Sequence, residues 1–149
     1  MTTKPNNPFA DKVGKLLDEE KHEELFTEGC CFHFALRLHR DRNIPSVEYC
    51  SYKYDIKSIT HVWLIGKDYD FDAKGVYEKN KVREIMKLKY DENKRGKIHG
   101  IFLDFGSISP MLLQEKIDEK SLSPELRKRL NDRILWYFDN DSKFQLLRR

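Results

Sequence analysis

The ten residues from Gly29 to Leu38, Gly-Cys-Cys-Phe-His-Phe-Ala-Leu-Arg-Leu, constrain the fold of this chain more than any other stretch. A turn residue and two cysteines lead directly into an apolar run, in which Phe34, Ala35 and Leu38 recur at helical spacing. This spacing predicts a helix that buries one face. It also predicts that Cys31 lies in the first turn of that helix.

A cysteine in the first turn of a helix can be chemically reactive. The unpaired backbone N–H groups and the positive end of the helix dipole favour the thiolate, which is the nucleophilic form. The same N–H groups can bind an oxyanion that develops on an attacked carbonyl. Free cysteines are more often buried as small apolar side chains. The motif alone therefore leaves both interpretations of Cys30 and Cys31 open.

Length and composition indicate a single globular domain over residues 1–149. Hydrophobic residues make up 39% and charged residues 36%, and the formal net charge of +3 is too small to predict nucleic-acid binding without a local patch. The first seven residues lack the apolar core of a signal peptide, and no apolar run approaches the roughly 20 residues that cross a bilayer. Three cysteines, two of them adjacent, make a poor disulfide framework, so we expect free thiols and a cytoplasmic location.

Hydrophobic periodicity predicts an α+β fold, in which a small antiparallel meander packs on the helix that begins at Cys31. The turn Gly66-Lys67-Asp68 is expected to join two strands of this meander. Ser109-Pro110 and Ser123-Pro124 each predict a helix start, because they pair an N-cap serine with proline at the first helical position. The predicted helices cover 9–26, 31–41 and 79–90 and follow Ser109 and Ser123; the predicted strands cover 46–54, 59–65, 69–73 and 98–105.

A cysteine nucleophile needs a base close by and a third group that orients the base. His61 lies near the start of a predicted strand, and the next strand returns alongside it with Asp70 and Asp72. A carboxylate on this neighbouring strand is expected to accept a hydrogen bond from the His61 ring and so fix its tautomer. Strand alternation places His61 and Trp63 on the same face.

These residues together resemble the core of the transglutaminase-like superfamily, which belongs to the wider group of papain-like thiol enzymes. The resemblance covers residues 29–75, about a third of the chain. Its motifs, in order, are Gly29-x-Cys31-x-x-x-Ala35-x-x-Leu38, Asn43-Ile44-Pro45, His61-Val62-Trp63 and Tyr69-x-x-Asp72.

The resemblance implies a papain-like core and a Cys–His–Asp triad. By position, Cys31 is similar to the family nucleophile, His61 to the general base and Asp72 to the carboxylate that orients the base. The implied reaction is acyl transfer on a peptide or side-chain amide, with a thioester intermediate and with His61 protonating the leaving amine. Water resolving the thioester would make the protein a protease or a deamidase, and an amine would make it a transglutaminase. We expect hydrolysis of a protein or peptide substrate, with no metal or other cofactor.

Position in the motif also decides between neighbouring candidates. Cys31 is preferred to Cys30 because only Cys31 lies two residues after a glycine and four before an alanine. Asp72 is preferred to Asp70 because of its spacing from Tyr69. Two departures stand out: the helix is about one turn shorter than is usual in the family, and residues 1–28 contain neither Gln nor Trp to help bind the oxyanion. An inactive relative of the family fits the same motifs.

Zinc binding is an alternative interpretation of the thiols and imidazoles. The possible ligands are Cys30, Cys31, His33, Cys50 and His61, but the Cys-Cys-x-His arrangement lacks the Cys-x-x-Cys spacing of structural sites. We expect His33 instead to make a local hydrogen bond, on a different side of the helix from Cys31.

A basic segment at residues 79–97 suggests a further alternative. It contains eight Lys or Arg against three Asp or Glu. Such a run is usually a solvated helix face, and nucleic acid is the less favoured partner. The same segment can attract an acidic protein. A non-catalytic binding or inhibitor protein on the same scaffold is therefore the alternative function.

Overall fold

The computed structural model describes residues 7–51, 59–94 and 104–148. The expected α+β class is confirmed. The elements, in chain order, are α1 (Pro8–Asp18), α2 (His22–Glu28), α3 (Cys31–Asp41), β1 (Ser46–Ser51), β2 (Ile59–Ile65), β3 (Asp70–Asp72), β4 (Gly75–Tyr77), α4 (Lys81–Lys94), β5 (Asp104–Ser107), α5 (Pro110–Asp118), α6 (Pro124–Asn140) and the 3₁₀ helix η2 (Ser142–Arg148).

The prediction of one helix over 9–26 is wrong, because the chain breaks after α1. Glu20 adopts a left-handed conformation with φ of 56°. The Glu20 N–H donates to the Leu17 carbonyl, and the Lys21 N–H donates to the Leu16 carbonyl. This pair of bonds is a Schellman motif, which normally has glycine at the left-handed position. The glutamate gave no such signal in the sequence.

The strands form one antiparallel sheet in the order β4-β3-β2-β1-β5. The predicted meander over β1, β2 and β3 is confirmed. The short strand β4 was not predicted. The predicted strands 46–54 and 98–105 match β1 and β5 in part, and their remaining residues, 52–54 and 98–103, lie outside the described residues.

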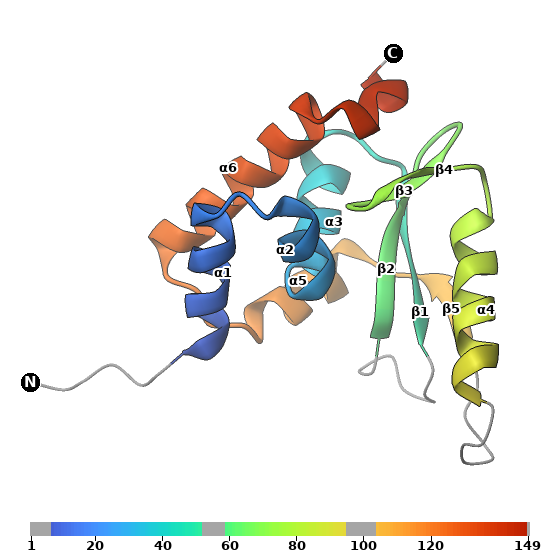
Figure 1. The fold of residues 1–149 in the computed structure, drawn as a ribbon, viewed down its shortest axis with the longest axis horizontal. Helices are drawn as coiled ribbons and strands as arrows, with labels where there is room; N and C mark the ends of the chain where they lie inside the picture. The colour runs from blue at the N-terminus through green and yellow to red at the C-terminus, as the bar shows by residue number, and fades with distance from the viewer. Residues whose placement is uncertain (1–6, 52–58, 95–103, 149) are drawn as a thin grey trace, which may run out of the picture.

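The sheet lies between two unequal helical layers (Figure 1): α4 covers one face and α3 packs against the other. Helices α2, α5 and α6 pack on α3, and α1 packs on α2 and α6. Each face has its own buried cluster. The main core joins Val62, Leu64 and Phe71 of the sheet to the larger helical layer. A smaller cluster joins Trp63 of β2 to Val82 and other apolar residues on the α4 side.

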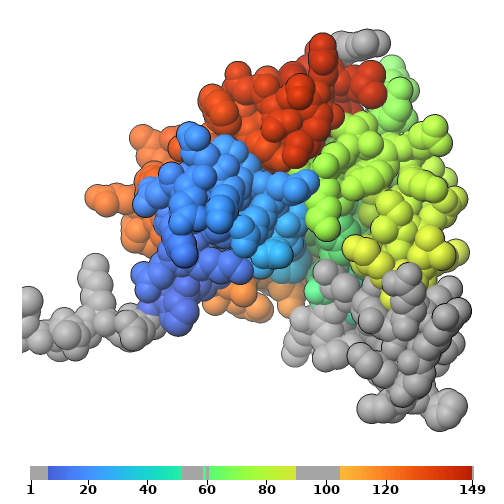
Figure 2. All heavy atoms as spheres, in the orientation of Figure 1, coloured from blue at the N-terminus to red at the C-terminus, as the bar shows by residue number. Residues whose placement is uncertain are grey.

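Opposite ends of the chain pack together in the larger layer. In the space-filling view (Figure 2), the blue N-terminal helices lie against the orange-to-red C-terminal helices. Serine caps at Ser109 and Ser123 start α5 and α6 as predicted, with each hydroxyl accepting a hydrogen bond from the N–H three residues later.

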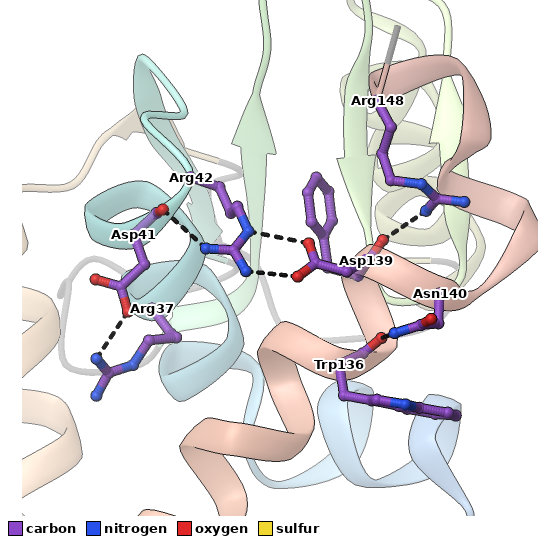
Figure 3. Close-up of polar contacts among 8 residues, drawn as sticks. Arg37, Asp41, Arg42, Trp136, Asp139, Asn140 and Arg148 are labelled. Atoms are coloured by element: carbon purple, nitrogen blue, oxygen red, sulfur yellow. Dashed lines mark hydrogen bonds and ion pairs between the residues drawn. The ribbon is translucent and has the colours of Figure 1, made fainter.

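An ion pair fixes the end of α3 to α6 (Figure 3). Arg42 Nε and Nη2 donate to the two carboxylate oxygens of Asp139, at 2.9 and 2.5 Å. One turn earlier on α3, Arg37 donates to Asp41 at 2.9 Å. The pair between Arg42 and Asp139 joins the end of α3 to α6, whereas the pair between Arg37 and Asp41 lies within α3 itself.

Within the described parts of the chain, every helix is too short or too polar to cross a lipid bilayer.

Candidate functional site

The thiol of Cys31 lies at the first residue of α3, with Cys30 as the N-cap. Cys31 is half-buried against the main core, and Cys30 is fully buried. Burial raises the pKa of the Cys31 thiol to about 11, although the backbone N–H groups of Phe32 and Cys31 and the charge of Lys120 act in the opposite direction. The helix start thus favours the thiolate as expected, but burial outweighs it, and the thiol is protonated at neutral pH.

His61 and Asp72 form a hydrogen-bonded pair on adjacent strands. His61 Nε2 lies 2.9 Å from Asp72 Oδ2. The other carboxylate oxygen accepts from the backbone N–H of Lys74 at 2.9 Å and from the Tyr77 hydroxyl at 3.4 Å. Because an ionised carboxylate only accepts hydrogen bonds, this geometry assigns the ring proton to Nε2.

Asp70, the other aspartate on this strand, makes different contacts. Its carboxylate pairs with Lys79 Nζ at 3.1 Å and accepts from the backbone N–H of Asn80 at 3.0 Å. It thereby fixes the chain just before α4. The structure therefore contains the predicted hydrogen bond to His61 and forms it with Asp72.

The sheet separates His61 from Cys31. The His61 ring stacks on Trp63, with centroids 5.7 Å apart, and Trp63 is buried in the cluster on the α4 side. The intervening Val62 points into the main core, against which Cys31 also packs. No hydrogen bond between described residues joins the Cys31 thiol to the His61 ring. The structure thus brings His61 and Asp72 together and places Cys31 on the other side of the sheet.

The candidate zinc ligands are also split between the two sides of the sheet. Cys50 pairs with His61 across β1 and β2, so both lie on the α4 side, whereas Cys30 and Cys31 lie on the α3 side. Cys50 is fully buried, and burial raises its pKa to about 12. Among the residues described, no three His, Cys, Asp or Glu side chains are arranged to hold a metal ion.

Some basic side chains of the segment 79–97 make contacts within the protein. Arg83 Nε donates to Glu48 on β1 at 2.6 Å, and its guanidinium lies over the Phe105 ring. Lys87 and Lys89 are exposed and form no ion pair with any described residue. Of the predicted segment 79–97, the side chains from residue 90 onward lie outside those described.

A cavity of about 160 Å³ between α3, α5 and α6 was not predicted from the sequence. His33 is only 3% exposed, and neither of its ring nitrogens has a hydrogen-bond partner among the described residues. The prediction of a local hydrogen bond for His33 is therefore wrong. The polar residues that line the cavity are His33, Arg37, Arg40, Gln114, Arg127 and Asn131.

A signal for this cavity was present in the sequence. His33, Arg37 and Arg40 recur at intervals of four and three, which places them on one face of a helix. The sequence does not predict which residues of the same chain pack opposite this helix face. Gln114 and Arg127, far away along the chain, meet this face only because α5 and α6 fold back over α3.

Comparisons with known proteins leave the chain without an assigned family. No family model, curated protein or solved structure matches it. The resemblance of residues 29–75 to transglutaminase-like enzymes therefore stays a prediction.

Proposed function

We propose that the protein is a non-catalytic binding protein, which uses the outer face of α4 to bind an acidic segment of a partner protein. The observation that carries this proposal is the exposed run Lys87-Leu88-Lys89. Two lysines without ion pairs to described residues flank a leucine that is 64% exposed. A large apolar side chain held in water between cations fits a partner that offers both carboxylates and an apolar contact.

The inner face of α4 supports this role because it fixes the outer face in place. Val82 and Met86 pack on the sheet, and the ion pair from Arg83 to Glu48 holds the same side of the helix. The helix therefore presents Leu88 from a rigid support, so binding does not require the helix to be ordered first.

Leu88 also favours a protein over nucleic acid. Phosphate contacts need cations only, whereas burying a leucine side chain against a partner contributes about 1.5–3 kcal/mol. With Lys81 already paired to Glu84 at 3.3 Å, few cations remain to neutralise phosphates.

The test measures binding by fluorescence anisotropy, with a labelled peptide of glutamates in which every fourth residue is leucine. The probes for comparison are a single-stranded oligonucleotide and a glutamate peptide without leucine. We expect the first peptide to bind most tightly. Leu88→Glu or the pair Lys87→Glu and Lys89→Glu should weaken binding by about tenfold or more.

The matched control is Lys15→Glu, an exposed lysine on α1. This charge reversal should leave peptide binding unchanged. Tighter binding of the oligonucleotide than of the peptide, or equal loss in the control, would refute a protein-binding face on α4.

Cysteine-dependent acyl transfer is the second candidate, and the hydrogen bond between His61 and Asp72 is the observation that favours it. An imidazole oriented by a carboxylate is the arrangement of a general base. In this reaction Cys31 attacks an amide carbon, and His61 protonates the leaving amine. It requires His61 and Cys31 to meet, which their positions on opposite sides of the sheet oppose.

Alkylation with iodoacetamide separates the two candidates. The rate at Cys31, followed by mass spectrometry across pH, should be low near neutrality and rise only in alkali, because burial raises the thiol pKa to about 11. His61→Ala should leave the rate unchanged. Rapid alkylation at pH 7 that is lost in His61→Ala would establish the catalytic pair and overturn the non-catalytic proposal.

A further inference from the structure

The buried imidazole of His33 is the most unusual polar group in the described chain. Buried polar side chains are normally hydrogen-bonded, because leaving one unpaired costs about 1–3 kcal/mol. His33 lines the cavity between α3, α5 and α6, with both ring nitrogens unpaired. A second buried donor on this cavity, Nε of Arg127, also lacks a partner among the described residues. Two unpaired nitrogen groups from different helices thus line the same cavity.

The charges around the cavity are mainly positive. Three arginines line it, and its lining contains no Asp or Glu among the described residues. Arg37 is neutralised by Asp41, but the one hydrogen bond that the Arg40 side chain makes to a described residue goes to the neutral amide of Gln114, at 3.1 Å. Arg127 forms no ion pair with any described residue. At least two guanidinium charges therefore face the cavity without a carboxylate opposite them.

The protonation of His33 agrees with this positive environment. Burial, followed by the charges of Arg127 on α6 and Lys120 beyond α5, lowers its pKa to about 4, while Asp118 on α5 acts in the opposite direction. Arg37 and Arg40 lie on the same helix as His33. At neutral pH the ring is therefore uncharged and can donate one hydrogen bond and accept another.

We propose that the cavity between α3, α5 and α6 binds a phosphate group, held by the guanidinium groups of Arg127 and Arg40 and by the imidazole of His33. Guanidinium groups match phosphate oxygens in geometry and charge. The donors come from two helices rather than one plane, which fits a tetrahedral anion better than a planar carboxylate. The volume of about 160 Å³ is below that of sites for drug-sized ligands, so it suits a group of a few atoms.

A second hollow extends this site toward solvent. It has a volume of about 420 Å³ and shares Arg37, Arg127 and Asn131 with the first cavity. Lys128 and Asp132 also line it. The rest of a small phosphorylated molecule fits here, so the bound phosphate is either free inorganic phosphate or the head of a phosphate monoester.

The test measures thermal unfolding and calorimetric binding of the full chain with inorganic phosphate, at constant ionic strength set by chloride. Phosphate should raise the unfolding temperature in a saturable way, because a ligand that binds only the folded state stabilises it. Glycerol 3-phosphate and acetate are the parallel probes. Tighter binding of glycerol 3-phosphate identifies a monoester site, and affinity equal to that of phosphate identifies an inorganic phosphate site.

Variants locate the binding. Arg127→Gln and His33→Gln should each weaken phosphate binding by about tenfold or more, because each removes a hydrogen-bonding partner of the charged phosphate. Arg129→Gln is the matched control on the same helix; its side chain is exposed and pairs with Asp18. It should bind phosphate like the parent chain.

Several outcomes would overturn the proposal. These are no saturable effect of phosphate, which means that the cavity holds water; an equal effect of chloride or acetate; and unchanged binding in Arg127→Gln. Should His33→Gln fail to fold, Arg127→Gln still decides, since Arg127 is only partly buried. The site lies on the opposite side of the sheet from α4, so its failure and that of the proposed protein-binding face are distinguishable.

Discussion

At the scale of single residues, Asp72 carries more of the local polar network than His61. The Asp72 carboxylate accepts hydrogen bonds from His61, Lys74 and Tyr77, and only 6% of the residue is exposed. Asp72→Ala removes the acceptor of all three donors and should destabilise the fold by about 1–3 kcal/mol. His61→Ala removes one donor and should cost less. Urea unfolding of the two variants measures this order, and a larger loss in His61→Ala would contradict the network.

Individual residues also show how much of the candidate site could be predicted. The position of Cys31 at a helix start and the hydrogen bond between His61 and Asp72 both follow from local pattern, because each depends on a few neighbouring residues. The raised pKa of Cys31 does not, since it depends on how deeply the packed helices bury the thiol. The same holds for His33, whose environment comes from α5 and α6.

At the scale of elements, the break between α1 and α2 depends on an unfavourable residue. Glu20 is left-handed, a conformation that costs a residue with a Cβ about 1–2 kcal/mol. Glycine avoids that cost but loses about 0.5–1 kcal/mol to its freer unfolded chain. Glu20→Gly should therefore stabilise the fold by up to about 1 kcal/mol, measured by urea unfolding. Destabilisation instead would mean that α1 and α2 are joined in another conformation.

Some helix ends carry a recognisable signal in the sequence, and others do not. The serine–proline pairs before α5 and α6 are explicit signals, because both residues act locally. The Schellman turn at Glu20 and the short strand β4 carry no such signal. Strand β4 forms because β3 offers it a free edge, which is a property of the assembled sheet.

At the scale of the whole molecule, the pair between Arg42 and Asp139 ties α3 to α6 and should make stability depend on acid pH. The hydrogen bond from Arg42 lowers the pKa of Asp139 below its ordinary value. The pair therefore stabilises the fold fully above about pH 4, and this contribution is lost as the pH falls through the lowered pKa. Because the two side chains are 33% and 40% exposed, we expect at most about 1 kcal/mol from this pair.

Asp139→Asn tests this contribution. The variant should be less stable than the parent chain at pH 7, and the difference should shrink at pH 3, as measured by urea unfolding at both values. A difference that stays constant between the two pH values would show that the carboxylate charge is not what joins the two helices.

The packing of Phe144 in η2 closes the main core from the C-terminal end. This fully buried ring contacts those of Phe34, Phe71, Tyr137 and Phe138. Phe144→Ala should cost about 3–5 kcal/mol in the free energy of unfolding. Leu146→Ala, in the same helix but 43% exposed, should cost much less. Similar losses in the two variants would mean that η2 only covers the surface.

The alternation of β2 also limits how this chain can change over evolutionary time. Val62 and Leu64 are anchored in one layer and Trp63 in the other, so no substitution at position 61 can transfer its side chain across the sheet. Only a shift of the β2 pairing register by an odd number of residues would do so. The same shift would move every anchored side chain of the strand to the opposite face of the sheet. An ancestor or descendant in which the side chain of residue 61 faces Cys31 would therefore differ from this protein by a re-registered strand rather than by a substitution at position 61.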